Sequence, residues 1–563
     1  MEYFKKKKYL IVVLSVSCLY GYIGLDCGVP NLNRSLLVFG TKDRIAQMSE
    51  DMVESRNKIY ANITGRDESD FNKKIDNDRT LLVGQMRTYL LRSTDPDEQQ
   101  TLAAIGNMSP GNLDFNPHFF GYGGAYLYIV PVFLCVFKTL GQVTISSDIS
   151  YYFLNPDEIA KIFIISRLVS AIAGVGVVLL IYLIAKMLFN SSVAIIAGTI
   201  AATTSIIIAN SHICKPHVLG LLFSLICIYF FIKASRGLST KQWILFGVFG
   251  GLATGASVHY ALVFLPVVFK FLRKPGLKRF NVELLLPGIS AIIMFFVTNP
   301  YVLISFHEAI SSVSYYSGGN GGWGYASLSS DKLFIAFQEL VIEGPLVVFM
   351  FFTLIYAICL YRKGNNEEKA LLEALLAMVV IHGLSLGGIR FMLLEICLFI
   401  LFGTGTIIYI LDQNSLFSKK LKNVVISLII IVNVLFSFPY IYDYVSKNKG
   451  EMAGEWINKN IPVGSTIGIT KDYPATWHTP PFEFENYKLI SIDKLHLIGE
   501  RPDFVILQKI GGKVRYANDL ENVRFKQNYV ELKKFGSTFL DSKLGIKVKH
   551  SFANQDVTIF KKI

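Results

Sequence analysis

The chain has 563 residues, of which 52% are hydrophobic and only 17% are charged. Soluble proteins contain about 25% charged residues, so this composition indicates a polytopic membrane protein. Basic cytoplasmic loops explain the formal net charge of +13. No stretch interleaves base-stacking aromatic residues with Lys and Arg in a soluble context, which argues against nucleic-acid binding. The seven cysteines lie mostly in or beside apolar runs without a CxxC pair, so they are predicted to pack as small apolar residues.

The first 120 residues divide into an apolar run and a polar segment. Four lysines, Lys5 to Lys8, precede an apolar run that lacks a small-x-small cleavage site. Residues 1–25 are therefore predicted to form an uncleaved first transmembrane helix with its amino end in the cytoplasm. Residues 26–120 are polar and are predicted to form an extracytoplasmic loop, with helices at 48–66 and 71–91.

Residues 121–445 are predicted to form a helical transmembrane module. Long apolar runs alternate here with short basic connections, which are expected to face the cytoplasm. Counting back from these connections leaves 121–141 without a net crossing, so this run is predicted to lie in the outer interface or to re-enter. Eleven crossings remain, with the amino end inside and the carboxyl end outside.

Residues 446–563 have an ordinary soluble composition and are predicted to form a small extracytoplasmic α/β domain. The segment 452–457 reads as a helix. Strands are predicted at 466–470, 487–492, 504–508 and 557–560. The predicted fold class is therefore mainly α, a polytopic transmembrane helical fold with a small C-terminal α/β domain.

An acidic motif lies near the end of the polar segment, shortly before the apolar residues begin. Asp95-Pro96-Asp97-Glu98 is followed by aromatic segments at 113–120 and 122–128. A carboxylate pair beside an aromatic interfacial segment suits chemistry on a lipid-borne substrate. Pro156-Asp157-Glu158 repeats the pattern, and these two acids are predicted to be the amino-terminal charges of the next helix.

Several short motifs carry a resemblance to a known family. They occur in this order: Pro96-Asp97-Glu98, Asn116-Pro117-His118-Phe119-Phe120, Ser166-Arg167-Leu168-Val169-Ser170-Ala171, Ser211-His212, Gly250-Gly251-Leu252-Ala253-Thr254-Gly255 with His259-Tyr260, Asn299-Pro300-Tyr301, and Arg390-Phe391. Over residues 90–445 the chain resembles the GT-C membrane glycosyltransferases, in particular the family 39-like branch with protein O-mannosyltransferases and aminoarabinose transferases. Two departures stand out: the segment before Pro96 is longer than usual, and His217 stands where many relatives have an acidic residue.

The resemblance implies roles for the two acids. In such enzymes the aspartate of the first loop contacts the acceptor hydroxyl or helps to bind a metal, and the sugar arrives on a polyprenyl phosphate. Asp97 is therefore the predicted general base, with Glu98 as the second catalytic candidate. The alternative is that the Asp-Glu pair caps a helix on a solvated loop.

A lipid-phosphate leaving group needs cations. Arg167 lies at the outer end of an apolar helix, where a phosphate would provide a partner, although snorkelling to the interface is an equal alternative. Lys215 and Arg390 are weaker candidates on the same side. The remaining predicted substrate-binding residues are Asn116, His118, His259 and Tyr260.

A divalent metal ion is a possible cofactor. His118, His212 and His217 map to the outer face and could hold the metal together with Asp97 or Glu98. Their spacing matches no metal-binding signature, and interfacial histidines that only form hydrogen bonds are the competing interpretation.

These observations favour an integral-membrane, inverting glycosyltransferase. Its expected partners are a polyprenyl-phosphate-linked sugar donor, membrane lipid, and a protein, lipid or glycan acceptor on the outer face of the plasma membrane. A transporter or flippase is one alternative, against which the sequence shows no internal repeat and no paired broken helices. A non-catalytic membrane assembly subunit is the other.

Overall fold

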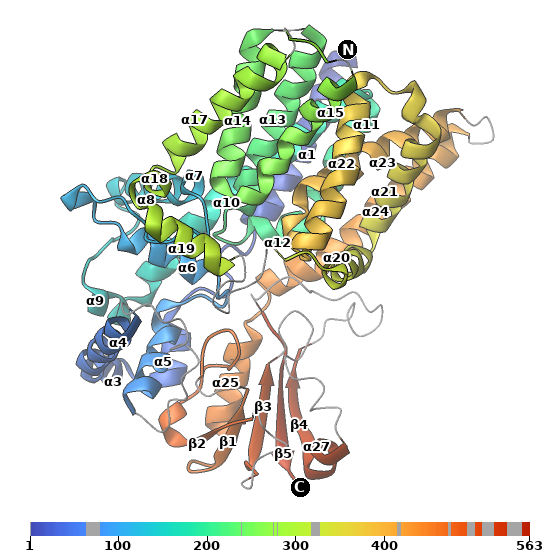
Figure 1. Ribbon diagram of the computed structural model, residues 1–563. Coiled ribbons are helices and arrows are strands. Elements are labelled where there is room, and N and C mark those ends of the chain that lie inside the picture. The colour runs from blue at the N-terminus through green and yellow to red at the C-terminus, as the bar shows by residue number, and fades with distance from the viewer. Residues whose placement is uncertain are drawn as a thin grey trace. The chain divides into compact units, whose positions relative to one another are not determined.

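The computed structural model describes residues 2–63, 79–237, 239–273, 275–277, 280–316, 327–413, 418–470, 474–492, 501–508, 523–536 and 554–563. The chain packs as two compact units (Figure 1). Unit 1 comprises Met1–Ile23, Gln100–Phe133 and Ser166–Phe438, and unit 2 comprises Gly24–Gln99, Leu134–Ile165 and Pro439–Ile563. Each unit is described below by itself.

Unit 1 is built from helices. Its elements, including those that cross its boundaries, are α1 (Glu2–Tyr22), α6 (Glu98–Asn107), η2 (Pro110–Asn112), α7 (Gly124–Leu127), α8 (Ile129–Thr139), α10 (Pro156–Leu188), α11 (Ser191–Ala202), α12 (Ser205–Ser211), α13 (His217–Gly237), α14 (Thr240–Ala256), η3 (Val258–Phe264), α15 (Leu265–Arg273), η4 (Phe280–Leu285), α17 (Leu286–Thr298), α18 (Tyr301–Ile304), α19 (Phe306–Tyr316), α20 (Ser330–Ile342), α21 (Pro345–Ile355), η6 (Tyr356–Leu360), η7 (Tyr361–Lys363), α22 (Asn366–Ser385), η8 (Ile389–Phe391), α23 (Leu393–Gln413) and α24 (Lys419–Val445).

Several of these helices can cross a membrane, so the chain is a multi-pass membrane protein. Among the described residues, six helices are long and apolar enough to span, at Pro156–Leu188, His217–Gly237, Phe280–Thr298, Pro345–Lys363, Leu393–Gln413 and Lys419–Val445. A seventh span results if α11 and α12, which meet at a 57° bend, are counted as one. The other apolar runs form helices that are shorter or more highly charged, which is why this number is below the eleven crossings expected from the sequence. The apolar part of α1, Lys8–Tyr22, and the helical stretch Gly124–Thr139 are two such shorter helices.

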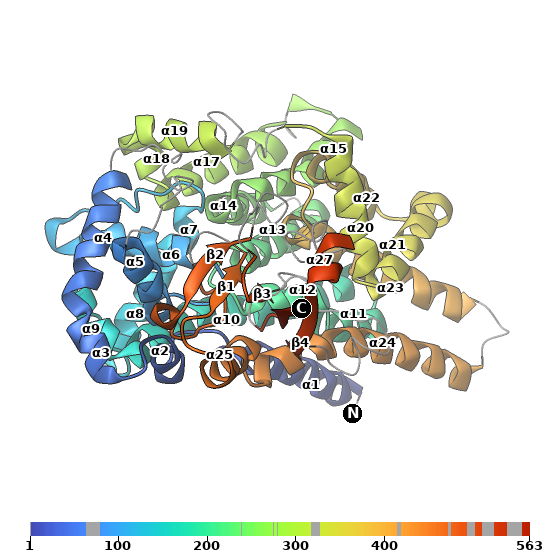
Figure 2. The same cartoon turned by 90° about the horizontal axis from the view of Figure 1, so that it is seen from below.

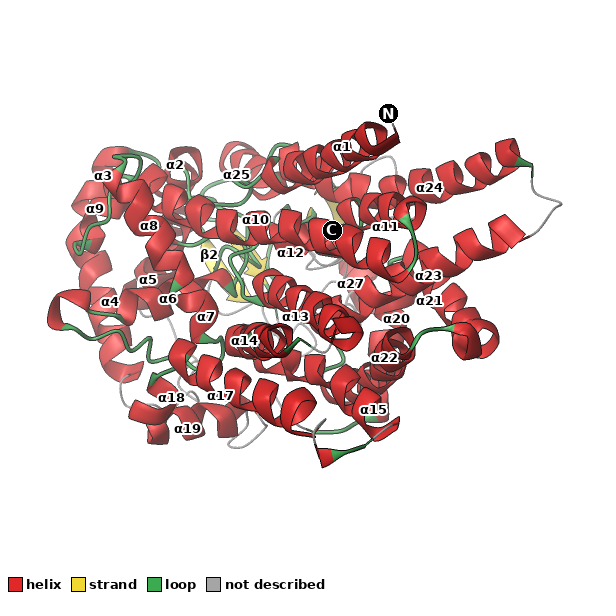
Figure 3. Cartoon of the chain, turned by 90° about the horizontal axis from the view of Figure 1, so that it is seen from above, coloured by secondary structure: helices red, strands yellow, loops and turns green. Residues whose placement is uncertain are grey.

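Glycines allow the central helices of unit 1 to approach closely. α14 lies between α13 and α17 (Figure 3). A Cβ atom placed on Gly247 would lie 2.2 Å from the carbonyl oxygen of Pro287, and one on Gly251 would lie 2.5 Å from that of Ala291. Small residues therefore bring the α14 and α17 backbones together, as in many membrane helix pairs.

Unit 2 combines short helices with a mixed sheet. Its elements are α2 (Leu32–Phe39), α3 (Lys42–Gln47), α4 (Ser49–Ile63), α5 (Arg79–Leu91), α9 (Ile149–Leu154), α25 (Lys449–Asn460), β1 (Thr466–Ile469), η9 (Phe484–Asn486), β2 (Lys488–Ser491), β3 (Phe504–Gln508), α27 (Val523–Asn528), β4 (Tyr529–Phe535) and β5 (Val557–Lys562). The strand order is β2-β1-β3-β5-β4. β1 runs parallel to β2 and β3, whereas β5 is antiparallel to β3 and β4.

The sheet of unit 2 is covered on both faces. On one face, Ile467 and Ile506 share a buried core with Ala453 and Ile457 of α25 and with residues of α2 to α5. α25 lies beside the sheet in Figure 2. On the other face, Val505 and Leu507 pack with Phe525 and Tyr529. All five residues of β3 are consequently buried.

The predicted fold class is confirmed: the chain is mainly helical and carries a small C-terminal α/β part. The four strands predicted in the tail correspond to β1, β2, β3 and β5, and the predicted helix to α25. β4 was missed because it is buried only at its ends, Tyr529 and Phe535, and the residues between them are exposed and mostly polar. The predicted helices at 48–66 and 71–91 correspond to α4 and α5, while residues 64–78 lie outside the described residues.

Candidate active site

The acidic motif forms a hydrogen-bonded turn in unit 2. The backbone N–H of Asp97 donates to Oδ1 of Asp95 at 2.9 Å, and Ser93 Oγ donates to Oε2 of Glu98 at 2.6 Å. Thr476 Oγ1 in turn donates to the carbonyl oxygen of Ser93 at 2.9 Å. Asp95 and Glu98 are buried, and Asp97 is the partly exposed carboxylate of the three. Of the two predicted catalytic acids, Asp97 is therefore the more accessible to an acceptor.

Glu98 is also the first residue of α6, where a carboxylate interacts favourably with the helix dipole. Thr101, one turn further along α6 and within unit 1, donates to the carbonyl oxygen of Cys214 at 2.8 Å. The loop 212–216 that carries Cys214 also carries the predicted residue Lys215.

The predicted cations Arg167 and Lys215 are buried together in unit 1, each 4% exposed. Ser170, one turn after Arg167 on α10, donates to the carbonyl oxygen of Lys215 at 3.3 Å. Tyr126 reaches the Ser170 hydroxyl at 3.5 Å. The long apolar helix α10 thus places Arg167 beside the loop that follows α12.

Arg390, the third predicted cation, belongs to the same region. Both Arg390 and Lys215 act electrostatically on the buried His217, and the Arg390 guanidinium lies 5.0 Å from the ring centroid of Phe391. The rings of His217 and His259 each lie beside Phe391, at centroid distances of 5.5 and 5.4 Å. Three predicted cations and two predicted histidines therefore meet in one part of unit 1.

Two residues of this region were not predicted as site residues. His382 Nδ1 contacts Oε1 of Glu395 through a short hydrogen bond, and His382 Nε2 lies 3.2 Å from the carbonyl oxygen of His259. Both side chains are buried. Their position in the sequence could have identified them, because each is a titratable residue inside an apolar run. Such residues are costly in a membrane unless they have partners. Tyr260, which was predicted, donates to the carbonyl oxygen of His217 at 2.7 Å.

Asn116 and His118 form a separate cluster in unit 1. His118 has a φ of +49°, which is rare for a residue with a side chain, and its backbone N–H donates to Asn116 Oδ1 at 3.0 Å. His118 Nδ1 lies 3.1 Å from Glu308 Oε1, and Asn116 Nδ2 donates to Ser305 Oγ at 3.1 Å. Glu308 was not singled out in the sequence, because it lies among ordinary residues of α19.

His212 does not have a ring nitrogen available for a metal. Its Nδ1 lies 2.8 Å from the carbonyl oxygen of Ile208, and its Nε2 lies 2.9 Å from that of Ile23. Burial lowers the pKa of His212 and Arg167 acts in the same direction, whereas the two carbonyl contacts oppose them. In the part of the chain that the structure describes, no three His, Cys, Asp or Glu side chains are placed to hold a metal ion. The predicted metal ligands thus do not assemble, and no chemical step is routed through a metal.

One family model matches the chain. Its description is dolichyl-phosphate-mannose-protein mannosyltransferase, and the match covers residues 162–304. This segment contains Arg167, Lys215 and His259. The predicted resemblance to GT-C glycosyltransferases is confirmed by this match.

The chain is also similar to solved structures, at low sequence identity. ArnT from Cupriavidus metallidurans bound to undecaprenyl phosphate is 12% identical, covering 85% of this chain and 96% of that one, with a TM-score of 0.43. The archaeal oligosaccharyltransferase AglB from Archaeoglobus fulgidus, in complex with an inhibitory peptide and a dolichol-phosphate, is also 12% identical, covering 69% of this chain and 60% of that one, with a TM-score of 0.43. No curated protein matches the sequence.

Proposed function

We propose that the protein is an integral-membrane, inverting glycosyltransferase that moves a sugar from a polyprenyl-phosphate donor to an acceptor on the extracytoplasmic face. The observation that carries this proposal is the convergence of Arg167, Lys215 and Arg390 in unit 1. Arg167 within α10 and Lys215 in the loop after α12 are buried, and Arg390 is half-buried. Cations placed among apolar helices suit the phosphate of a lipid carrier, which would arrive from the membrane. The match to a mannosyltransferase family over residues 162–304 supports the same reaction class.

In the proposed mechanism Asp97 acts as the general base. Its carboxylate takes the proton of the acceptor hydroxyl while the acceptor oxygen attacks the anomeric carbon of the sugar. The bond between that carbon and the phosphate oxygen breaks, and the polyprenyl phosphate leaves with the electron pair. The configuration at the anomeric carbon is thereby inverted. Arg167, Lys215 and Arg390 stabilise the negative charge that develops on the departing phosphate.

Other residues would position the reactants. The Ser93 hydroxyl holds Glu98, and the Asp95 carboxylate fixes the backbone of Asp97, so the turn presents Asp97 in one orientation. His259 and Tyr260 would contact the donor, and the cluster of Asn116 and His118 would bind sugar or acceptor. The proposed site faces the outside of the plasma membrane, with the amino end of the chain in the cytoplasm and the C-terminal α/β part outside.

The test is transfer of radiolabelled sugar from a panel of polyprenyl-phosphate sugars in membranes that contain wild type or Asp97→Asn. We expect Asp97→Asn to lower the transfer rate by about 100-fold or more at equal protein level, because a missing general base costs at least that much. Asp157→Asn is the matched control, since Asp157 occupies the same Pro-Asp-Glu sequence but is exposed in the first turn of α10. Its rate should equal that of wild type.

Two outcomes would contradict the proposal. Equal transfer by wild type and Asp97→Asn would remove Asp97 from the chemistry. Absence of transfer from every donor would contradict the enzyme class and direct attention to lipid or solute transport. A parallel series with EDTA tests whether a divalent metal takes part.

A further inference from the structure

Two buried groups of unit 1, His382 and Glu395, have no role in the proposed mechanism. They form a short hydrogen bond through His382 Nδ1 and Glu395 Oε1, and the two side chains are 4% and 0% exposed. Nε2 of His382 lies 3.2 Å from the carbonyl oxygen of His259. A carbonyl oxygen can only accept, so this nitrogen carries a proton and donates. The dyad therefore holds the backbone of His259, a predicted substrate-binding residue.

The backbone of His217 is held in a similar way. The Tyr260 hydroxyl donates to the carbonyl oxygen of His217 at 2.7 Å, and the Tyr260 side chain is 1% exposed. The rings of His217 and His259 are neighbours, with their centroids 5.9 Å apart. The Phe391 ring lies beside both of them. Buried side chains thus fix the positions of the two histidines through their backbones.

Each of these two rings has a nitrogen atom that no hydrogen bond satisfies. Within the described residues, Nδ1 of His217 and Nε2 of His259 are buried and have no partner. The other nitrogen of His259, Nδ1, lies 2.9 Å from the hydroxyl of Ser257. Buried polar groups in native proteins are normally satisfied, so the two nitrogens point to a bound polar group. His259, Arg390 and Phe391 are only partly buried, so the cluster can be reached from the surface of unit 1.

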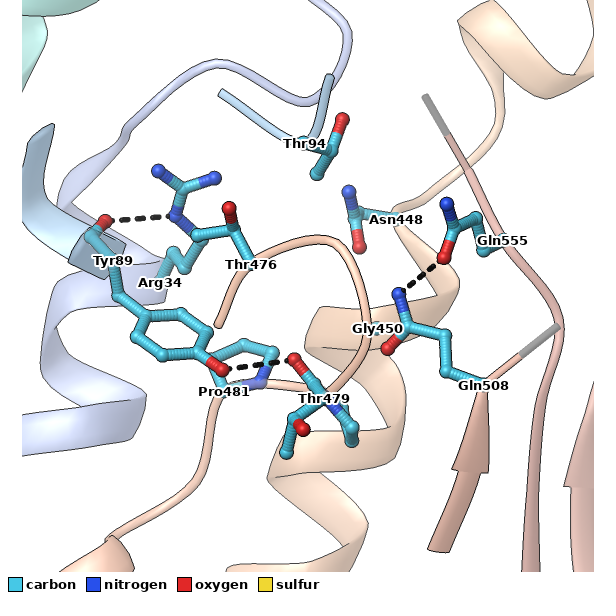
Figure 4. Close-up of a pocket in the computed structure, with 11 residues that line it drawn as sticks. Arg34, Tyr89, Thr94, Asn448, Gly450, Thr476, Thr479, Pro481, Gln508 and Gln555 are labelled. Carbon is cyan, nitrogen blue, oxygen red and sulfur yellow. Dashed lines mark hydrogen bonds between the residues drawn. The ribbon is translucent and has the colours of Figure 1, made fainter. Parts of the chain in front are cut away.

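The polar groups beside Arg34 in unit 2 do not require a ligand. The amides of Gln508 and Gln555 form one hydrogen bond of 2.8 Å with each other and line a small cavity together with Arg34 and Thr94 (Figure 4). The volume of this cavity is about 20 Å³, which is enough for ordered water but not for a sugar. Water can therefore satisfy these amides. His217 and His259 differ from them because they lie among the residues of the proposed donor site.

We propose that His217 and His259 bind one hydroxyl group of the donor sugar. His382 and Glu395 are then positioning residues that act through His259. A hydroxyl group both donates and accepts, so it can satisfy one ring nitrogen that carries a proton and one that does not. The donor phosphate would lie at the cations of the same region, of which Arg390 acts electrostatically on both rings. This inference rests on the proposed function, because its ligand is a polyprenyl-phosphate sugar.

The experiment compares donors in the transfer assay described above. The polyprenyl-phosphate sugar that wild type uses best is compared with each of its monodeoxy analogues, in which hydrogen replaces one hydroxyl group. For one analogue we expect kcat/KM of wild type to fall about tenfold or more, because the two histidine nitrogens are left without a partner. In His217→Phe and His259→Phe the ratio of kcat/KM between donor and analogue should fall to about twofold or less, since the group that contacts the hydroxyl is removed.

The same ratio tests the positioning residues. His382→Phe should reduce it, because the hydrogen bond to the carbonyl oxygen of His259 is lost. Glu395→Gln should retain it, because the amide can still pair with Nδ1 of His382. Glu283→Gln is the matched control, since it removes another buried acid of unit 1, which pairs with Lys270. It should affect transfer from donor and analogue equally and leave the ratio unchanged.

Several outcomes would overturn the inference. Equal use of every monodeoxy analogue by wild type would mean that no hydroxyl group is recognised. A ratio that stayed unchanged in both histidine variants would assign the hydroxyl to other residues, and a ratio that fell equally in Glu283→Gln would report damage to the fold. In these cases transfer from the parent donor would still support the proposed function. Absence of transfer from every donor would overturn that function and this inference with it.

Discussion

The two units bury charged groups in different ways. In unit 1 two buried acids are each paired with a basic partner from a neighbouring element. Lys270 and Glu283 form an ion pair of 2.9 Å, with side chains 9% and 1% exposed, and His382 pairs with the fully buried Glu395. Each pair brings opposite charges or a proton donor and acceptor together, which limits the cost of placing them among apolar helices.

Unit 2 contains both a cation that is paired with acids and one that is not. Lys449 lies 3.0 Å from carboxylate oxygens of both Asp443 and Asp556. Burial acts to lower the pKa of Lys449, but the two aspartates outweigh burial and raise it. Arg34 is buried more deeply, yet within the described residues its charge is balanced by backbone carbonyls and the more distant Glu451.

This contrast separates charges that are balanced by an opposite charge from a charge that is balanced mainly by backbone dipoles. In a pair such as Lys270–Glu283 each charge already has its counter-ion, so a bound anion would gain nothing there. Among the residues that the structure describes, Arg34 has no counter-ion at such a distance; backbone carbonyls accept its hydrogen bonds instead. Substitutions in the two units should therefore change stability for different physical reasons, and three of them are considered in order of expected effect.

The largest effect is expected for Lys270→Met in unit 1. Removal of one partner from a buried ion pair leaves Glu283 as an uncompensated buried charge, which costs about 3–5 kcal/mol. The contact of Lys270 with the Trp243 ring, at 5.0 Å, is lost at the same time. Chemical unfolding of the purified protein in detergent, followed by tryptophan fluorescence, measures the loss.

The double variant Lys270→Met/Glu283→Leu is the matched control, because it removes both charges. It should recover most of the stability lost in the single variant. If the single and double variants were equally unstable, the ion pair would not be the reason for the effect, and packing of the long Lys270 side chain would be.

A smaller but clear effect is expected for Gly454→Ala in unit 2. A Cβ atom at Gly454 would lie 1.7 Å from the carbonyl oxygen of Pro481, so α25 would have to move away from this segment. Overpacking of this kind costs about 1–3 kcal/mol.

Gly464→Ala introduces backbone strain without a steric clash, so it is the control for the clash expected at Gly454. Gly464 has a φ of +87°, and a Cβ atom placed on it would have no other atom within 4 Å. Alanine there should therefore cost only about 1 kcal/mol. Hydrogen exchange of peptides from α25 measures both variants. If the two substitutions reduced the protection of these peptides equally, the close contact between α25 and Pro481 would not be the reason for the effect of Gly454→Ala.

Much of the fold followed from the sequence, because long apolar runs and alternating strands leave strong patterns. α10 is an example, with Pro156 at its start, Asp157 and Glu158 in its first turn and Lys186 in its last. β4 was not predictable, since its exposed polar residues are held by pairing with β5. The 57° bend between α11 and α12 was also hidden, because both helices lie within one apolar run.

The candidate site was only partly visible in the sequence. The motifs pointed to Arg167, Lys215, His217, His259 and Arg390, which the fold brings into one region of unit 1. His382, Glu395 and Glu308 could not be assigned from spacing, because they join the predicted residues through contacts between elements that are far apart in the chain. The surroundings of Arg34 could not be predicted from the sequence. They are formed by α2, α5, the segment 476–481 and the ends of two strands, which are far apart in the chain.

The smallest effect is expected for Asp503→Asn at the surface of unit 2. Asp503 Oδ2 accepts from the backbone N–H and the hydroxyl of Thr466 at 2.8 and 2.7 Å, which joins β3 to β1. These two hydrogen bonds lower the pKa of Asp503. A carboxyl group whose pKa is lower in the folded state stabilises the fold above its unfolded pKa of about 3.9, and this contribution is lost as the pH falls through the folded pKa.

Because Asp503 is exposed, its contribution should be about 0.5 kcal/mol at neutral pH. Hydrogen exchange of β1 and β3 should therefore be slightly faster in Asp503→Asn than in wild type at pH 7, and the difference should shrink as the pH falls below about 4. Glu531→Gln makes the same change of charge on the exposed part of β4 and should show no such dependence. A difference that persisted unchanged in acid would mean that the amide disrupts the link between β1 and β3 for steric reasons, rather than through loss of the charge on Asp503.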